Sequence, residues 1–424
     1  MNVLLIGSGG REHALAYKIS ESPKLTKLYC APGNPGIEKF AELVLLDINK
    51  KREVVEFCKA NNVDLVVIGP EQPLVDGLAN ELRKYEIPVV GPNKYAAMIE
   101  GDKSFSKELM KKYSIPTADF EVFTKNEKDK AVRYLDKTTY PTVIKASGLA
   151  AGKGVAICNS EEEAVKTIDE YFEEDIFGES GHTIVIEEFL EGEEASVFVL
   201  TDGMEYFVLP PSQDHKRALN GDQGKNTGGM GAYAPAPLIT DSLMAEIKES
   251  IISPTLEAMA IEDRLFNGCL YCGLMITDEG PKVIEFNCRF GDPETQCVLP
   301  LLEGDFLKLL YSAAIGKIDQ SSVNYNGGSS VCVVAASKGY PDKYEIGFGI
   351  TGLDLRQDNI IVYHAGTKKI DDKVVTNGGR VLGVTSFIKE NNLTLAKQIA
   401  YDALSKINFK GITYRTDIAD KALK

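Results

Sequence analysis

The chain has 424 residues, of which 44% are hydrophobic and 26% are charged. This composition supports a large buried core, and the length predicts about two to three domains. The formal net charge of −15 excludes a non-specific binder of nucleic acid or of an anionic membrane, because such a surface repels both polyanions. Phosphate ligands must therefore be held by local lysines.

The cysteines and the N-terminus indicate a cytoplasmic protein. Eight cysteines are scattered without paired spacing, so we expect reduced thiols. Cys269 and Cys272 form a Cys-x-x-Cys pair in an apolar, strand-like run without a second Cys or His pair, which excludes a zinc site. Residues 1–6 lack a basic segment and predict a buried strand rather than a signal peptide. No run approaches the roughly 18 apolar residues of a membrane span.

Residues 1 to about 100 alternate short Val/Ile/Leu runs with helix-like segments, which predicts a parallel sheet with helices on its faces. Gly7-Ser-Gly-Gly-Arg-Glu12 follows the first strand and opens a helix expected to start at Glu12, so its backbone N–H groups are predicted to hold a phosphate or carboxylate. A nicotinamide cofactor does not fit, because Glu12 replaces the third fingerprint glycine and residues 31–34 supply no ribose acid. Glu71 follows another buried strand, which makes it either a ligand-binding group or a carboxylate in a solvated turn.

Residues 145–154, Lys-Ala-Ser-Gly-Leu-Ala-Ala-Gly-Lys-Gly, form a cationic, glycine-rich tip between two strand-like runs, 141–145 and 155–158. A Walker A loop is excluded, because Gly148 and Gly152 are too close together and Gly154 replaces the hydroxyl residue.

The hairpin is therefore predicted to close over a polyphosphate. Its N–H groups and Lys153 would contact the phosphates from above, while Lys145 reaches them from the strand. The alternative is a flexible surface hairpin with solvated lysines.

Residues 120–190 are expected to form a compact α/β segment that contains this hairpin, with a helix capped by Ser160 and Glu163. A strand over residues 183–190 leads into Glu191-Gly-Glu-Glu194 and a second strand. Such a linker offers adenine a backbone donor and acceptor and offers ribose a carboxylate; a charged turn is the alternative.

Residues 210–231 show little periodicity and many glycines, which is typical of a long functional loop or of a disordered one. His215 in this segment is expected to be a hydrogen-bonding residue rather than a catalyst.

Residues 283–289 read as a strand on which Glu285, Asn287 and Arg289 share one face and Ile284 and Phe286 share the other. Two oxygen ligands at this spacing suit Mg²⁺, which takes the rest of its shell from phosphates and water. We expect Arg289 to hold an acyl or phosphoryl oxygen. An amphipathic edge strand is disfavoured by the constrained polar turn that follows.

After about residue 325, strands near 330–335, 360–364 and 380–384 and a helix over 394–407 predict a small α+β module that closes one side of the site.

Together these segments resemble the ATP-grasp superfamily and, within it, the phosphoribosylamine glycine ligase family. The resemblance covers essentially the whole chain and is carried by residues 7–13, 69–74, 145–154, 187–194, 213–217, 226–231 and 285–294. It implies a multidomain α/β and α+β fold: an N-terminal parallel-sheet domain (1–102), an ATP-grasp domain (103–325) with a mobile lid at about 120–190, and a C-terminal module (326–424).

The resemblance also implies roles for individual residues. For ATP these are Lys103, Lys145, Gly148, Gly152, Lys153, Gly154, Glu187, Leu190 and Glu194, with Glu187 and Leu190 at the adenine and Glu194 at the ribose. For the other substrates they are Gly9, Gly10, Arg11, Glu71, Asp214, Asn226, Arg289, Asp292 and Pro293. Glu285 and Asn287 would hold Mg²⁺, with Mn²⁺ as a possible substitute, and Arg289, Lys145 and Asp214 would act in catalysis. The second acid that many ATP-grasp enzymes carry before the metal strand is missing from residues 270–275.

The implied activity is the ATP-dependent joining of glycine to 5-phosphoribosylamine through glycyl phosphate, in purine biosynthesis, by a monomer or weak homodimer. Asp214 would accept the amine's proton or bind glycine's ammonium group. The alternatives are another ATP-grasp ligase or carboxylase of purine metabolism, a non-catalytic nucleotide sensor, and a hydride-transferring oxidoreductase, which the broken glycine fingerprint disfavours.

Overall fold

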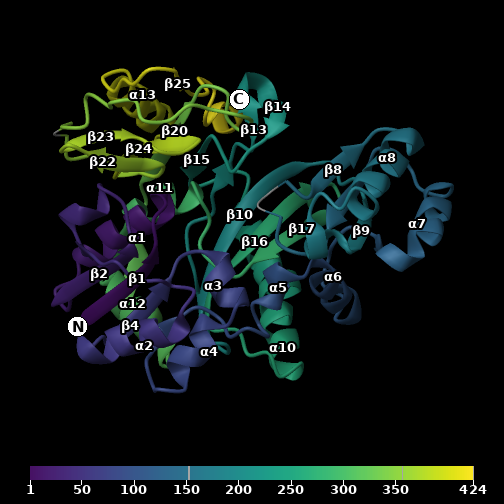
Figure 1. Ribbon diagram of the computed structural model, residues 1–424, viewed down its shortest axis with the longest axis horizontal. Helices are drawn as coiled ribbons and strands as arrows, with labels where there is room; N and C mark the ends of the chain where they lie inside the picture. Colours follow the sequence, from purple (N-terminus) through teal and green to yellow (C-terminus); the bar gives the residue numbers. More distant parts are fainter. Residues whose placement is uncertain (151–152, 356, 424) are drawn as a thin grey trace.

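The computed structural model describes residues 1–150, 153–355 and 357–423. Figure 1 shows an N-terminal domain at the lower left, a C-terminal part at the upper left, and a lid that projects to the right from a central antiparallel sheet. In the described part of the chain, no helix has both the length and the apolar character that crossing a bilayer requires.

The N-terminal domain is built on a parallel sheet of order β3-β2-β1-β4-β5. Strands β1 and β4 are almost fully buried because helices cover both faces, which explains their continuous apolar sequence. The predicted parallel sheet is thus confirmed, although α1 begins at Gly10 and not at Glu12. The elements are β1 (Asn2–Gly7), α1 (Gly10–Ser20), β2 (Lys27–Pro32), β3 (Glu42–Leu43), α2 (Lys51–Ala60), β4 (Leu65–Ile68), α3 (Glu71–Val75), α4 (Leu78–Arg83) and β5 (Val89–Val90).

Two helices, α5 (Met98–Gly101) and α6 (Lys103–Lys112), lead from this domain toward the lid. Asp102 caps α6 by accepting from the Phe105 N–H, and it also accepts a hydrogen bond from the Ser147 hydroxyl at 2.7 Å. The start of α6 is therefore tied to the base of the glycine-rich hairpin.

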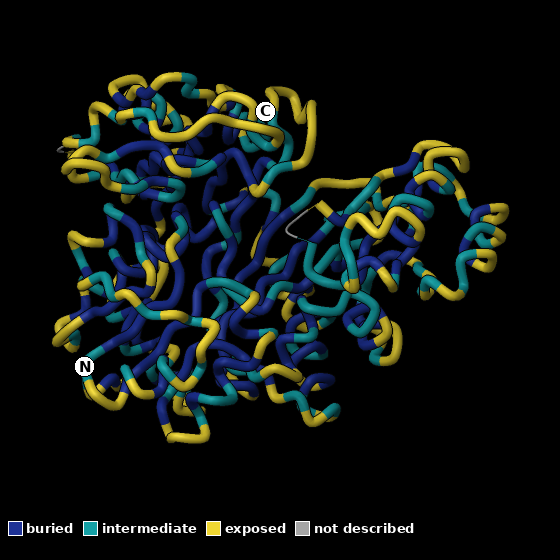
Figure 2. The backbone as a smooth tube through the Cα atoms, in the orientation of Figure 1, coloured by how far each residue is buried: buried dark blue, intermediate teal, exposed yellow. Residues whose placement is uncertain are grey.

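The lid is a sheet of order β6-β9-β7-β8 covered by α7 (Lys128–Leu135) and α8 (Glu161–Phe172). Its strands are β6 (Phe120–Thr124), β7 (Thr142–Ala146), β8 (Val155–Cys158) and β9 (Thr183–Glu188). Strands β7 and β8 pair in antiparallel fashion, as the hairpin prediction requires, and Ser160 caps α8 by accepting from the Glu163 N–H. The lid has its own hydrophobic cluster, separate from the main core, and its outer edge is exposed in Figure 2.

The central sheet has the antiparallel order β11-β10-β16-β17. Its strands are β10 (Glu193–Thr201), β11 (Tyr206–Val208), β16 (Gly268–Thr277) and β17 (Gly280–Asn287), and the flanking helices are α9 (Asp241–Ile247), α10 (Ser253–Ile261), α11 (Glu294–Val298) and α12 (Phe306–Ala314). Cys269 and Cys272 lie buried and unbonded on β16, in agreement with the expectation of reduced thiols.

The C-terminal sheet has the order β12-β15-β20-β24-β21, with β25 (Ile412–Thr413) paired to β20. It carries the predicted strands as β20 (Ser329–Ser337), β21 (Ile360–His364) and β24 (Arg380–Ile388), together with the helix α13 (Leu393–Leu404). Smaller pairs are β18 (Leu302–Gly304) with β19 (Val323–Tyr325), and β22 (Thr367–Ile370) with β23 (Lys373–Thr376).

The segment 210–231 is not the irregular loop that its sequence suggested. It contains β12 (Gln213–Asp214), β13 (Arg217–Leu219) and β14 (Gln223–Asn226), and it runs into β15 (Gly231–Ala234). These strands are too short for their periodicity to be visible in sequence. Because β12 and β15 belong to the C-terminal sheet, a domain boundary at residue 325 separates strands of one sheet.

Candidate active site

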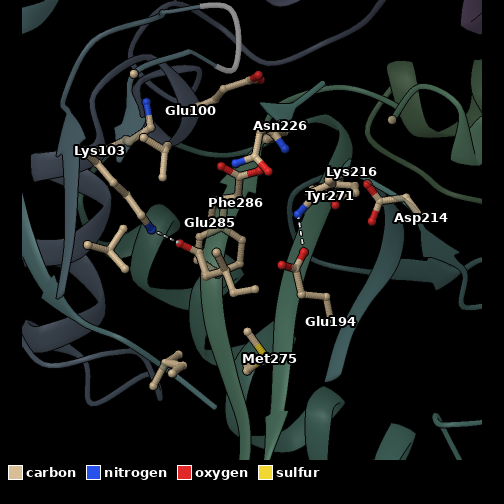
Figure 3. Close-up of a pocket in the computed structure, with 18 of the residues that line it drawn as sticks. Glu100, Lys103, Glu194, Asp214, Lys216, Asn226, Tyr271, Met275, Glu285 and Phe286 are labelled. Atoms are coloured by element: carbon tan, nitrogen blue, oxygen red, sulfur yellow. Dashed lines mark hydrogen bonds and ion pairs between the residues drawn. The ribbon is translucent and has the colours of Figure 1, made fainter. Parts of the chain in front are cut away.

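A cavity of about 1310 Å³ lies where the lid, the central sheet and both terminal domains meet. Figure 3 shows Lys103, Glu285, Lys216 and Glu194 converging on it. Among the sequence-predicted residues, those that line it are Arg11, Glu71, Lys103, Lys145, Gly154, Glu187, Leu190, Glu194, Asp214, Asn226, Glu285, Asn287, Arg289 and Asp292. Gly9, Gly10, Gly148, Lys153 and Pro293 are not in its lining, and Gly152 lies outside the described residues.

Two lysines share one carboxylate at the lid side of the cavity. The Nζ atoms of Lys145 on β7 and Lys107 on α6 lie 3.0 and 2.8 Å from Glu187 Oε2. The Oε1 atom of Glu187 is buried and makes no hydrogen bond with the described residues. Burial lowers the pKa of Lys107 to about 8, although Glu187 opposes the change. Sequence reasoning missed Lys107, because a lysine on an amphipathic helix normally faces solvent.

Lys103 links α6 to the hairpin. Its backbone N–H donates to the Ser147 carbonyl at 2.8 Å, and its Nζ donates to the Gly148 carbonyl at 3.2 Å. Burial lowers the pKa of Lys103, while the neighbouring Glu285 opposes the change. The predicted phosphate lysine is thus held at the base of the hairpin, with its ammonium at the cavity.

Glu285 lies on β17 opposite Gly273 of β16, so a glycine faces the carboxylate across the strand pair. Burial would raise the pKa of Glu285, but Lys216, Lys145, Lys103 and Arg289 together hold it below its usual value. The side chains of Glu285 and Asn287 both line the cavity. Their ionised carboxylate and amide oxygen fit a hard cation such as Mg²⁺. The described residues contain no group of three or more His, Cys, Asp or Glu residues that would hold a metal ion, so phosphates or water must supply the remaining ligands.

Strand β17 ends at Asn287, two residues earlier than the predicted alternation required. The Cys288 N–H donates to Glu100 at 2.7 Å instead of to a neighbouring strand. Arg289 therefore projects from the following bend. It forms ion pairs with Glu71 at 3.2 Å and with Glu100 at 2.9 Å. Glu71 is thus a half-buried ion-pair partner at the cavity rather than a carboxylate in a solvated turn.

The pKa shifts of these two acids follow from burial and from Arg289. Burial would raise the pKa of Glu71, but Arg289 and Arg11 hold it below its usual value. For Glu100 burial dominates and raises the pKa in spite of Arg289.

In the N-terminal glycine motif, a backbone N–H group is hydrogen-bonded to the side-chain carboxylate of Glu12, which belongs to the same motif. The Gly9 N–H donates to Glu12 Oε2 at 2.6 Å, and Arg11 Nε lies 2.6 Å from Glu12 Oε1. A Cβ atom at Gly69 would lie 2.1 Å from Glu12 Oε1, so glycine leaves room for this carboxylate. The Gly9 N–H is therefore not open to a ligand anion in this structure. The spacing of three residues between Gly9 and Glu12 is that of a capping box, which was the available sequence signal.

The opposite wall of the cavity carries acids. Asp214 on β12 and Glu294 at the start of α11 are both buried and both line the cavity. Lys216 pairs with Glu194, as the dashed line in Figure 3 shows. Glu294 was not predicted, because its approach to Asp214 depends on packing between distant segments.

His215 does not behave as the hydrogen-bonding residue that was expected. Its ring packs against Tyr233 with centroids 5.9 Å apart, and both ring nitrogens are buried without a hydrogen-bond partner among the described residues. Burial, reinforced by Arg415 and Lys421, lowers the pKa of His215 to about 4. The side chain is therefore neutral near pH 7.

The lid, the antiparallel central sheet and the lysine-lined cavity over β17 define an ATP-grasp protein. Comparison with known proteins agrees. Three parts of the chain match the models described as phosphoribosylglycinamide synthetase N domain (residues 1–100), ATP-grasp (A) domain (101–295) and C domain (330–421). The chain belongs to the phosphoribosylglycinamide synthetase family, and the resemblance seen in the sequence is confirmed.

Individual relatives support this assignment over the full length. A phosphoribosylamine–glycine ligase from Caldanaerobacter subterraneus subsp. tengcongensis is 45% identical, and the match covers 99% of each chain. The solved structure of the phosphoribosylamine–glycine ligase from Thermotoga maritima is 34% identical, has a TM-score of 0.86 and covers 99% of this chain and 100% of that one. The biotin carboxylase domain of the Hydrogenobacter thermophilus 2-oxoglutarate carboxylase, solved with MgADP and bicarbonate, shares the fold at 16% identity. Its TM-score is 0.73, and the match covers 100% of this chain and 97% of that one.

Proposed function

We propose that the protein joins glycine to 5-phosphoribosylamine in purine biosynthesis, with ATP converted to ADP and phosphate and glycinamide ribonucleotide as the product. The observation that carries the proposal is the cavity wall on which Lys103, Lys145 and Arg289 surround Glu285 within the ATP-grasp fold of this family.

The chemistry explains why ATP is needed. A carboxylate repels an amine nucleophile and has no good leaving group, so glycine must first be activated as an acyl phosphate. Phosphoryl transfer of this kind depends on positioning and on neutralising charge. Lys145, Lys103 and Arg289 line the cavity. The two lysines are proposed to contact the transferring phosphoryl group, and Arg289 is proposed to hold the acyl oxygen. The hairpin and the lid would then exclude water from the acyl phosphate.

The linker between β9 and β10 is proposed as the nucleoside site. Leu190 in the linker and Glu187 on the preceding strand β9 both line the cavity. The buried Oε1 atom of Glu187 makes no hydrogen bond with the described residues, so it needs a donor. Adenine offers such a donor in its amino group. Glu194 would hold the ribose hydroxyls, together with its partner Lys216.

Glu285 and Asn287 are proposed to hold Mg²⁺, with Mn²⁺ as a substitute. When bound, the metal ion would neutralise phosphate charge. The contribution of the chain is to present two oxygen ligands on β17, with lysines on either side that keep Glu285 ionised.

We further propose a cytoplasmic monomer or weak homodimer that uses only small-molecule substrates. The cytoplasmic location is supported by the described cysteines, all of which are buried and free. Sedimentation over a range of concentrations tests the oligomeric state.

The decisive experiment measures phosphate release from ATP and Mg²⁺ with glycine, with and without phosphoribosylamine generated in place, followed by mass analysis of the product. Release that requires both substrates and yields glycinamide ribonucleotide supports the proposal. Turnover only with another acid or amine would keep the ATP-grasp assignment and overturn the substrate pair.

A further inference from the structure

Strands β13 and β14 form a hairpin, residues 217–226, that lies beside the C-terminus in Figure 1. In the described structure the two strands pair only with each other. The one large apolar side chain of the hairpin, Leu219, is 58% exposed. A two-stranded hairpin is at best marginally stable by itself. Its position must therefore be fixed by contacts with other parts of the protein.

Arg415 supplies the central contact. Its side chain is only 2% exposed, and its Nη1 donates to the Arg217 carbonyl at 3.0 Å and to Asp222 Oδ1 at 2.9 Å. Its Nε and Nη2 donate to the two carboxylate oxygens of Asp417, each at 2.7 Å. A bidentate pair of this kind fixes orientation as well as distance. One guanidinium thus joins β13 and the turn after it to the C-terminal segment.

Neighbouring contacts between the hairpin and residues 415–417 are also polar. Asn220 in the turn donates from Nδ2 to Thr416 Oγ1 at 2.6 Å, and its Oδ1 accepts from the Thr416 N–H at 3.0 Å. A further ion pair, between Lys225 and Asp342, is exposed to solvent and contributes little. The hairpin is therefore held mainly by hydrogen bonds to the end of the chain, with Arg415 as the buried member of the set.

The held segment forms part of the cavity. The residues of the hairpin and of the turn after it that line the cavity are Arg217, Asp222, Asn226, Thr227 and Gly228. Arg415 does not belong to the lining, so it acts on a ligand only through the hairpin.

We infer that Arg415 is a positioning residue of the active site: it holds the β13–β14 hairpin at the cavity and thereby sets the affinity for the non-nucleotide substrates. This inference rests on the proposed function and on the family resemblance, which places Asn226 among the residues for glycine and phosphoribosylamine. ATP binding should depend on Arg415 much less, because Lys103 and Lys145 are carried by α6 and β7.

The physical reason is preorganisation. A hairpin that moves freely in the empty enzyme must be ordered when a substrate binds, and the cost of ordering it weakens binding. Such a loss affects substrate and transition state equally, so it raises KM and leaves kcat unchanged. A variant that is merely less well folded behaves differently, because a smaller active fraction lowers kcat without altering KM.

The test begins with Asn220→Ala, because Asn220 is exposed and lies outside the cavity lining. Removing its two hydrogen bonds should raise the KM of glycine or of phosphoribosylamine by about 3- to 10-fold. Arg415→Lys keeps the buried charge but cannot bridge Asp417 and the hairpin at once, so the same KM should rise by about 10-fold or more. The control is Gln223→Ala, which shortens another exposed polar side chain of the hairpin.

In both test variants kcat and the ATP KM should stay within about twofold of the unaltered enzyme, as should all constants of the control. A second measurement does not depend on turnover. Amide hydrogen exchange of residues 217–226 in the substrate-free enzyme should be faster in Asn220→Ala and Arg415→Lys than in Gln223→Ala.

Three results would overturn the inference: unchanged KM values for both non-nucleotide substrates, a fall in kcat alone, or an equal rise in the ATP KM. Thermal unfolding establishes that each variant folds, and Asn220→Ala and Arg415→Lys weaken the same attachment from opposite sides. Failure of the unaltered enzyme to join glycine to phosphoribosylamine would instead overturn the proposed function.

Discussion

Lys107 Nζ lies 2.8 Å from Glu187 Oε2, and both side chains are only 3% exposed. Lys107 also donates to the Thr117 hydroxyl at 2.7 Å, so it connects α6 to the segment that enters the lid. A buried carboxylate that loses a cationic partner keeps its desolvation cost, even though Lys145 remains as a second partner.

We therefore expect Lys107→Met to lower the free energy of unfolding by on the order of 3 kcal/mol. The exposed Lys111 on the same helix supplies the matched control, and Lys111→Met should change stability by no more than about 0.5 kcal/mol. Urea unfolding of both variants measures the difference. Equal stability of the two would show that Lys107 does not support Glu187.

Arg289 forms ion pairs with two acids, Glu71 and Glu100. This arrangement predicts that stability lost by replacing Arg289 is partly restored when one of the two acids is also replaced. Arg289→Met leaves the buried Glu100 and the half-buried Glu71 without their partner. This change should destabilise the protein by about 3 to 5 kcal/mol, mainly through Glu100. Adding Glu100→Gln removes one orphaned charge, so the double variant should recover part of the loss. Chemical denaturation of the single and double variants checks this, and strictly additive losses would contradict it.

The lid hairpin and the shared face of Glu285 and Asn287 could be predicted from the sequence, because both depend on local spacing. Residues 145–154 lie between strands that pair as predicted, and Glu285 and Asn287 share a face through strand alternation. Glu100 was not predictable in this way, since its partner, the Cys288 N–H, lies 188 positions along the chain.

Long-range pairing also explains the other missed residues. Glu294 joins the site through a contact with Ser196, 98 positions away. The capping acid Glu12 was missed for a different reason, because its local spacing signal competed with a resemblance to a phosphate-binding loop. The sequence therefore indicated the residues that line the cavity more completely than the ion pairs that hold them.

The metal assignment predicts a specific defect for Glu285→Ala. Without this carboxylate, Mg²⁺-dependent turnover should fall by about 100-fold or more. Asp278→Ala, at the exposed turn between β16 and β17, is the control and should retain normal activity. Rates measured across a Mg²⁺ titration test this, and full turnover of Glu285→Ala would exclude Glu285 as a metal ligand.

The raised pKa of Asp214 predicts how the affinity for glycine depends on pH. Its pKa is raised to about 7 by burial and by Glu294 and Glu194, against the opposing effect of Lys216. Below that pH the empty site holds a protonated Asp214. If Asp214 binds glycine's ammonium group, as the family resemblance implies, that group then loses one anionic acceptor. The glycine KM should rise up to about tenfold per pH unit below pH 7 and level off above it.

The measurement is the glycine KM between about pH 5.5 and 8.5, at saturating ATP. Asp214→Asn should flatten the profile at a high KM, because its amide does not titrate in this range. A profile of unchanged shape in the variant would assign the titration to another group.

The close packing around Gly148 predicts that a larger residue does not fit at the base of the hairpin. Its N–H donates to the Ser180 carbonyl at 3.0 Å, and a Cβ atom added at Gly148 would lie 2.7 Å from the Ser180 Cα atom. That neighbour is backbone and cannot rotate away, so Gly148→Ala must displace the hairpin from the segment that carries Ser180.

We expect this overpacking to cost about 1 to 3 kcal/mol, and to appear as a 10- to 100-fold rise in the ATP KM if it acts on the closed lid. Gly349→Ala is the matched control, since a Cβ atom there would meet no heavy atom within 4 Å. ATP titrations of both variants decide the point. An unchanged ATP KM in Gly148→Ala would mean that hairpin closure does not depend on its contact with Ser180.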